Sequence, residues 1–238
     1  MPRNRHQHIR HLLIGAAAIC VAALVPLSGG PAAKTKIHGG FVSGERFLDW
    51  PILRQRAYVT GLIEGMLLAP EMGGDPKKLG WLTVCADAIG RRGIRRAINR
   101  YLNARDATLN NRNPAKMYRA VRAGCLEKGT KRRSDPRVGG GYMTNKAYLD
   151  LNGLQKRAYV AGLVEGLILA PAFGGSQDQL DVFLACVDRL GWNGVRRAIN
   201  AELLASSRLW PSRDPKTRSR AILRYCARQD RAKGVKKS

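Results

Sequence analysis

Histidine is almost absent from this chain, and its four copies all lie at or before His38. Histidine is the commonest general base and the commonest zinc ligand, so the rest of the chain cannot hold a Ser-His-Asp or Cys-His arrangement. The cysteines are spaced too widely for a zinc site. The chain also lacks a phosphate-binding loop and a dinucleotide fingerprint. The sequence therefore predicts a protein without metal or cofactor that is not an enzyme.

Acidic and aromatic residues are scarce as well. Lys and Arg number 42 against 17 Asp and Glu, the formal net charge is +25, and only 6% of the residues are aromatic. A field of this sign attracts polyanions such as nucleic acid, anionic lipid headgroups, cell-wall polymers or an acidic protein. So few aromatic side chains cannot build a base-stacking platform, which argues against nucleic acid. The alternative is a bias in composition that only keeps the protein soluble.

Long apolar runs are missing except at the N-terminus. Arg3, Arg5 and Arg10 precede an uncharged stretch from Leu12 to Leu27, and small residues follow. This order is typical of a secretory signal peptide, here residues 1–33, and the stretch is short for a membrane-spanning helix. We expect a periplasmic or secreted protein that touches a membrane only through an uncleaved signal or through surface charge.

An internal duplication with an offset of 101 residues organises the remaining chain. Residues 58–70 (YVTGLIEGMLLAP) return at 159–171 (YVAGLVEGLILAP), and roughly 33 of 82 positions match without a gap. We predict two modules with a basic, glycine-rich linker and a basic, disordered tail. Their boundaries are 41–128 for the first repeat, 129–141 for the linker, 142–229 for the second repeat and 230–238 for the tail.

Apolar residues recur at helical spacing within each repeat, and no strand-like alternation competes with them. Gly61 and Gly65 lie four residues apart on the same predicted helix and return in the second copy. Glycine in a helix costs about 1 kcal/mol relative to alanine, so its retention predicts that another backbone packs closely there. We predict an all-α protein of two tandem small bundles, each of about four helices, after an N-terminal signal helix.

Helix-breaking residues divide each repeat at matching places. Pro70 and Pro171 are expected to end the first long helix. Gly90 and Gly191 suit the C-terminal cap of the next helix. These breakers support the same order of helices in both copies.

Cysteine also follows the duplication. Cys20 lies in the apolar N-terminal stretch, whereas Cys85, Cys125, Cys186 and Cys226 fall two to a repeat, 40 residues apart. Four cysteines allow three connectivities, and the duplication favours the pairing inside each repeat. Such a bridge would close each bundle and contribute about 4 kcal/mol in the chain-entropy model. The alternative is four buried free thiols in a reducing compartment.

Glu64 and Glu165 are the most informative of the polar residues that both copies keep. Each sits in an apolar helix, where an unpaired carboxylate is costly, so we expect each to pair with an arginine kept in both copies or to cap the following turn. A catalytic acid and a contact to a partner are the alternatives. Other candidates for polar or partner contacts, for which a solvated helix face is the alternative, are Arg56, Arg157, Arg96, Arg197, Asn99 and Asn200.

The repeated pattern is similar to a known family. It consists of Tyr58 to Gly65, Cys85, Ile94 to Leu102, and Pro114 to Cys125, and it recurs 101 residues later. It resembles the Rap1a/Tai family of secreted bacterial immunity proteins. The resemblance implies periplasmic helical domains with one structural disulfide each. Such proteins bind and block cell-wall amidase toxins delivered by type VI secretion, and they are not enzymes.

Two departures from that family bear on function. This chain has two modules where the family usually has one, and its charge is unusually high. No binding residue can be transferred by motif. The sequence thus leaves three hypotheses. The first is an immunity-type protein-binding module, and the second is a cationic envelope adaptor that binds anionic polymer or a membrane surface. The third is a small-substrate enzyme built around Glu64 or Glu165.

Overall fold

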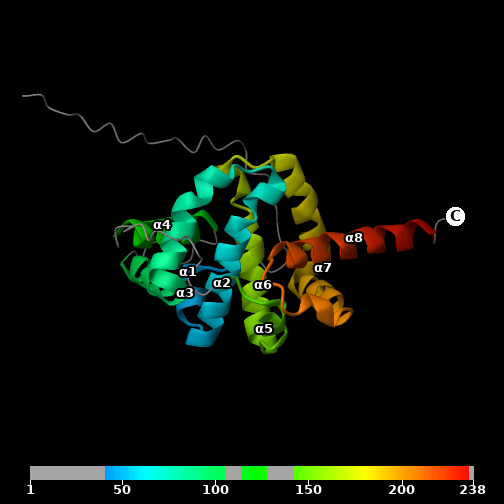
Figure 1. The fold of residues 1–238 in the computed structure, drawn as a ribbon, viewed down its shortest axis with the longest axis horizontal. Coiled ribbons are helices and arrows are strands. Elements are labelled where there is room, and N and C mark those ends of the chain that lie inside the picture. The colour runs from blue at the N-terminus through cyan, green and yellow to red at the C-terminus, as the bar shows by residue number, and fades with distance from the viewer. Residues whose placement is uncertain (1–40, 105–113, 128–141, 236–238) are drawn as a thin grey trace, which may run out of the picture. The chain divides into compact units, whose positions relative to one another are not determined.

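The helices repeat in the same order in both halves of the protein, as the duplication predicts (Figure 1). The computed structural model describes residues 41–104, 114–127 and 142–235, and every element in these ranges is helical. The predicted signal peptide and linker lie outside the described residues. The first repeat contains α1 (Gly44–Leu48), α2 (Ile52–Leu67), η1 (Ala69–Met72), η2 (Pro76–Leu79), α3 (Gly80–Asn103) and α4 (Pro114–Glu127). The second contains α5 (Asn145–Leu149), α6 (Gly153–Leu167), η4 (Ala170–Phe173), α7 (Gln177–Leu204), η5 (Ser207–Leu209) and α8 (Lys216–Val235).

Short polar and proline signals set the helix boundaries. Ser43 and Thr144 are matched residues, and each side chain accepts a hydrogen bond from a backbone N–H of the helix that it precedes. This satisfies a donor that would otherwise lack a partner at the helix start. Pro70 and Pro171 stand in the 3-10 turns that follow α2 and α6, so the predicted stop of the first long helix is confirmed.

Gly90 and Gly191 interrupt the two longest helices. Their φ angles are 60° and 58°, and both ψ angles are 172°, so the backbone leaves the helical conformation there. Only glycine adopts such a conformation without strain. The predicted end of the second helix is therefore confirmed. The third predicted helix starts directly afterwards, which makes α3 and α7 bent helices with two segments each.

Helices α2 and α6 pack side by side in parallel and form the most extensive contact between helices in the described residues (Figure 1). A Cβ on Gly61 would lie 2.8 Å from the backbone N of Leu163, and a Cβ on Gly162 would lie 2.8 Å from the backbone N of Leu62. These contacts are interchanged between the repeats, as in an isologous two-fold interface. The backbone predicted to pack against the glycines is thus the matching helix of the other repeat.

A second reciprocal contact joins the turns after α2 and α6. The N–H of Asp75 donates to the carbonyl of Phe173 at 2.9 Å, and the N–H of Ser176 donates to the carbonyl of Met72 at 2.6 Å. The hydrophobic core is likewise one cluster with buried residues from both repeats. The predicted arrangement of two separate bundles is therefore not confirmed, because the copies pack on each other as two halves of one core.

Each half is closed by its own disulfide. Cys85 joins Cys125 across α3 and α4, and Cys186 joins Cys226 across α7 and α8, with Cα atoms 5.5 and 5.9 Å apart. The pairing favoured by the duplication is confirmed. Two structural disulfides are characteristic of proteins that fold outside the reducing cytosol.

Helix α8 extends to Val235, so it continues into the segment 230–238 for which we expected no regular structure. This corrects the expected start of the tail. The segment contains arginine, alanine and lysine, which have high helix propensity, so α8 can continue into it. In the described ranges, none of the helices combines the length and apolar character that a membrane span requires.

Candidate functional site

Glu64 lies buried at the junction of the two repeats, with 2% of its surface exposed. Its Oε2 accepts hydrogen bonds from the hydroxyl of Tyr159 at 2.5 Å and from Nη2 of Arg218 at 2.6 Å. Its Oε1 accepts from the backbone N–H of Met143 at 2.6 Å. The glutamate therefore does pair with an arginine. The predicted partner was wrong, however, because Arg218 on α8 is not one of the arginines kept in both copies.

Arg218 is itself fully buried, which makes this ion pair an interior one. Its Nη1 donates to Oδ1 of Asn145 at 2.6 Å and to the carbonyl of Met143 at 3.1 Å. Its guanidinium also lies 5.3 Å from the ring centre of Tyr159. A buried ion pair needs such additional hydrogen bonds to offset the cost of desolvating both charges.

Glu165 occupies the matching place in the other half, but no cation pairs with it among the described residues. Its Oε2 accepts from the hydroxyl of Tyr58 at 2.6 Å, and its Oε1 accepts from the N–H of Val42 at 2.8 Å. The position matched to Arg218 is Met117, a buried apolar residue. Burial raises the pKa of Glu165 to about 7, although the hydrogen bonds from Tyr58 and Val42 act in the opposite direction. The two glutamates thus differ in charge compensation despite their shared geometry.

We expect the stability of the protein to depend on pH through Glu165. A group with an ordinary pKa of 4.5 and a folded-state pKa of about 7 stabilises the fold fully at low pH, and this contribution is lost as the pH rises through 7. At about 1.4 kcal/mol per pKa unit, the total is about 3 kcal/mol. Glu165→Gln cannot ionise. Its free energy of unfolding, relative to that of the unaltered protein, should therefore rise by about 3 kcal/mol between pH 4 and pH 8 in urea titrations.

Gln179, an exposed residue on α7 that does not titrate, provides the control. Gln179→Ala should leave the pH dependence of unfolding as it is in the unaltered protein. Curves for Glu165→Gln and the unaltered protein that run parallel from pH 4 to pH 8 would show that Glu165 does not titrate in this range.

These acids hold the junction together and are not open to a substrate. Each carboxylate oxygen of Glu64 and Glu165 already accepts a hydrogen bond from the protein. In the ranges that the structure describes, no group of three or more metal-ligating side chains comes together. The two glutamates were candidates for contacts with a partner, but both are enclosed within the core.

Asn99 belongs to a polar network centred on Gln55. The side-chain oxygen of Gln55 accepts from Nη1 of Arg95 at 3.0 Å and from Nδ2 of Asn99 at 3.3 Å. Its amide nitrogen donates to the carbonyls of Phe47 at 3.1 Å and Leu48 at 3.2 Å. The network ties α3 to the start of α2, so Asn99 has a structural contact. Sequence reasoning missed Gln55 because the second copy has a lysine there.

The remaining candidates lie at or near the surface. Arg96, Arg157 and Arg197 are exposed, whereas Arg56 and Asn200 are partly buried. The side-chain oxygen of Asn200 is enclosed and has no hydrogen-bond partner in the structure, and the same holds for Nε of Arg56. The structure therefore separates this set into an exposed group and a group with enclosed polar atoms.

Three arginines of the first repeat lie near one another, on α2 and α3. Burial lowers the pKa of Arg95, and the charges of Arg56 and Arg96 lower it further. Arg54 belongs to a separate group, because its pKa is lowered by burial and by two other arginines, one of them Arg157. Within the described residues, no carboxylate forms an ion pair with Arg56, Arg95 or Arg96. We call these three residues the arginine cluster, and their mutual repulsion favours binding of an anion.

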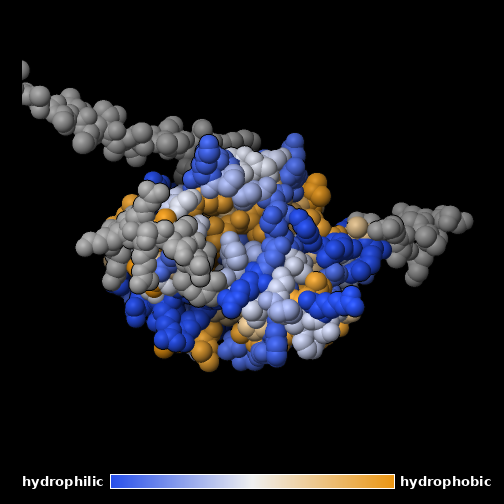
Figure 2. All heavy atoms as spheres, in the orientation of Figure 1, coloured by the Kyte–Doolittle hydropathy of each residue, from blue (hydrophilic) through white to orange (hydrophobic). Residues whose placement is uncertain are grey.

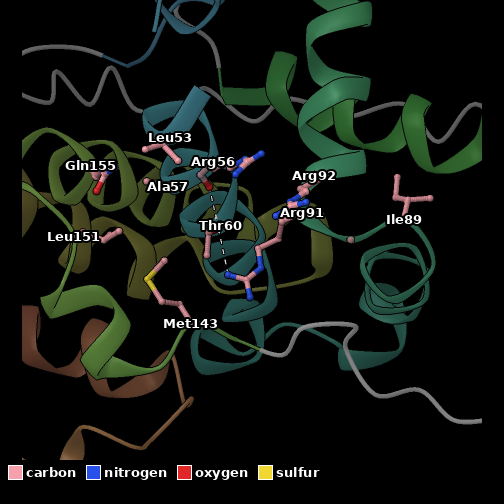
Figure 3. A pocket seen from close by; sticks show the side chains of 11 residues that line it. Leu53, Arg56, Ala57, Thr60, Ile89, Arg91, Arg92, Met143, Leu151 and Gln155 are labelled. Carbon is pink, nitrogen blue, oxygen red and sulfur yellow. Dashed lines mark hydrogen bonds between the residues drawn. The ribbon is translucent and has the colours of Figure 1, made fainter. Parts of the chain in front are cut away.

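A cavity of about 480 Å³ adjoins the arginine cluster (Figure 3). Figure 3 shows α2 residues behind it, the bend of α3 on one side and residues of the second repeat on the other. Arg91 reaches across from the bend, and its Nη1 donates to the hydroxyl of Thr60 at 3.4 Å. The lining residues are Leu53, Arg56, Ala57, Thr60, Ile89, Gly90, Arg91, Arg92, Met143, Leu151 and Gln155.

The corresponding residues in the second repeat have a different chemistry. Arg91 and Arg92 are matched by Trp192 and Asn193, and Thr60 is matched by Ala161. The arginine pair at the bend of α3 is thus peculiar to the first repeat, whereas Arg56 is matched by Arg157. Comparison of the copies therefore points to Arg56 but not to Arg91 and Arg92.

The wider surface around these features is polar with apolar areas between. On the face drawn in Figure 2, hydrophilic side chains cover much of the described surface and smaller hydrophobic areas lie among them. Comparisons with protein-family models, with curated proteins and with solved structures found no match for this chain.

Proposed function

We propose that this chain is a secreted or periplasmic binding protein that engages an acidic protein partner through the arginine cluster. It acts by binding and not by catalysis, as the resemblance to Rap1a/Tai immunity proteins implies. By the same resemblance, a secreted amidase-type toxin is the kind of partner expected. The two disulfides support a location outside the cytosol.

The observation that carries the proposal is the lack of compensating charge around the arginine cluster. Arg56 and Arg157 occupy matched positions in the two copies, and Arg95 and Arg96 are kept in the second copy as well. Placing like charges side by side disfavours folding, and no described carboxylate offsets them. A partner that supplies carboxylates would offset this repulsion through charge-assisted hydrogen bonds.

The enclosed positions of Glu64 and Glu165 support binding over catalysis. In the described residues, the two buried glutamates are engaged by tyrosine hydroxyls and backbone N–H groups. Histidine does not occur after His38. General acid–base chemistry needs a titratable group that can reach a substrate, and neither glutamate meets this condition.

A capture experiment with charge-matched variants tests the proposal. The unaltered protein is used as bait in envelope extract of the source cell, with washes at low salt and at about 1 M salt, where exposed charges are screened within about 3 Å. We expect one stoichiometric acidic protein to survive the high-salt wash. The variant Arg96→Gln, which changes an exposed member of the cluster, should weaken its purified complex by at least about tenfold, or 1.4 kcal/mol.

The control removes the same charge elsewhere. Arg122 on α4 and Arg208 on η5 are exposed and lie outside the arginine cluster. Arg122→Gln and Arg208→Gln, each made singly, should leave the affinity within about twofold of the unaltered protein. Losses in these controls equal to the loss in Arg96→Gln would show that net charge alone drives binding. Retention of salt-labile anionic polymer or lipid without a protein would favour the envelope-adaptor hypothesis.

A further inference from the structure

The cavity beside the arginine cluster is built by both repeats together. Leu53, Arg56 and Thr60 come from α2, and Arg92 follows the bend of α3 (Figure 3). Met143, which precedes α5, completes the wall from the second repeat with Leu151 and Gln155. The site therefore exists only when the two halves pack on each other.

The second-repeat wall is held in place by the buried ion pair. Met143 donates its N–H to Glu64 at 2.6 Å and accepts from Arg218 at 3.1 Å. Both partners are buried and hydrogen-bonded further, so this wall is fixed before any ligand arrives. A preformed cavity of about 480 Å³ falls in the range typical of ligand sites.

The charge of the cavity points to an anion. Arg56 and Arg92 face it without a carboxylate partner among the described residues. Within the described residues, no acceptor forms a hydrogen bond with the Arg56 guanidinium, so the protein leaves its donors unsatisfied. A guanidinium forms two parallel hydrogen bonds with a carboxylate, so a carboxylate near Arg56 would satisfy donors that the protein leaves open.

The other residues that line the cavity indicate which class of molecule bears the anionic group. Leu53, Leu151 and Met143 offer an apolar surface close to the arginines. The Thr60 hydroxyl is already bonded to the Arg56 carbonyl and to Arg91. Oε1 of Gln155 accepts from the N–H of Asn152. The side-chain N–H groups of Gln155 can still donate, which suits a peptide carbonyl better than a plain hydrocarbon chain. The lining therefore matches an acidic residue next to an apolar residue in a peptide.

We propose that this cavity receives a short peptide segment of the protein partner in which a carboxylate adjoins an apolar side chain, with Arg56 and Arg92 binding the carboxylate and Leu53, Leu151 and Met143 covering the apolar side chain. This assignment rests on the proposed function and identifies the feature of the partner that is recognised.

The test uses the full chain with both disulfides and a pair of fluorescein-labelled peptides that contain Leu-Glu or Leu-Gln in the same context. Fluorescence anisotropy should show the Leu-Glu peptide binding at least about tenfold more tightly than Leu-Gln. Arg56→Gln should remove most of this preference. Arg157→Gln is the matched control, because Arg157 is the same residue at the same position of the other copy, which has Trp192 and Asn193 in place of Arg91 and Arg92. It should retain the preference.

Arg92→Asn is a second variant that does not disturb the core, since Arg92 is exposed and the second copy carries asparagine there. It should also lose the preference, at an unchanged urea midpoint. Equal binding of the two peptides, or equal losses in Arg56→Gln and Arg157→Gln, would overturn the assignment. Displacement of the peptide by inorganic phosphate or by phosphatidylglycerol vesicles as effectively as by unlabelled peptide would also overturn it.

Failure here can be told apart from failure of the proposed function. If Arg56→Gln and Arg92→Asn still bind the captured partner whereas Arg96→Gln does not, the partner uses Arg96, which does not line the cavity, and the cavity assignment is wrong. If no protein is captured at all, the proposed function fails, whatever the peptides do.

Discussion

Gly61→Ala is expected to destabilise the protein by about 3 kcal/mol or more, although alanine is the better helix former. The added methyl group would overlap the backbone carbonyl of Tyr159 and would lie 2.8 Å from the N of Leu163. Backbone atoms cannot rotate away as a side chain can, so α2 and α6 would have to separate. Their separation would expose the apolar residues that they bury together. Urea unfolding with the disulfides intact measures the loss as a lower midpoint.

The two-fold arrangement makes this prediction more specific. Gly162 meets the matching atoms of Tyr58 and Leu62, so Gly162→Ala should cost about as much as Gly61→Ala. Gly80 is the control, because it is also helical but a Cβ added to it would meet nothing within 4 Å. Gly80→Ala should be neutral or stabilising by about 1 kcal/mol. An unchanged midpoint in Gly61→Ala would mean that the repeats do not pack through these helices.

The sequence predicted the local structure of each repeat well, because the signals involved are local. Proline after α2, glycine at the bend of α3, and the paired cysteines all act over a few turns or appear twice in the chain. The close approach at Gly61 and Gly65 was also predicted. The pattern did not reveal which helix packs against these glycines, because packing inside a repeat and packing between repeats require the same glycines.

The candidate site was less predictable because several of its residues differ between the two copies. The charged lining at Arg91 and Arg92 has no counterpart in the second copy. Arg218 likewise stands where the first copy has Met117, so a comparison of the copies discarded the partner of Glu64. Residues common to both copies indicate what the shared fold requires, but they give no information on residues that act in one copy alone.

The two halves therefore share the same helix arrangement but differ in the charge compensation of their buried glutamates. One junction glutamate is compensated by Arg218, and the backbone of Met143 that this pair holds also forms a wall of the cavity. The other glutamate, Glu165, has tyrosine and backbone donors only. The compensated junction and the arginine-lined cavity thus occur on the same side of the two-fold arrangement.

Arg218→Met copies the residue at the matched position of the first repeat and is expected to cost about 3–5 kcal/mol at neutral pH. The variant would leave Glu64 buried at 2% exposure without a cation, and Asn145 would lose its donor at 2.6 Å. Urea titrations of the variant and the unaltered protein at about pH 7 measure the loss as a lower free energy of unfolding.

A double-mutant cycle separates lost charge compensation from lost packing. Glu64→Gln alone leaves Arg218 as a buried uncompensated cation and should also destabilise the protein strongly. Glu64→Gln combined with Arg218→Met removes both charges, so it should recover much of the stability that either change loses. Simple addition of the two losses would show that Glu64 and Arg218 act independently. In the recovered double variant the Met143 wall loses its charged support, so the Leu-Glu peptide should bind less tightly even though the fold is restored.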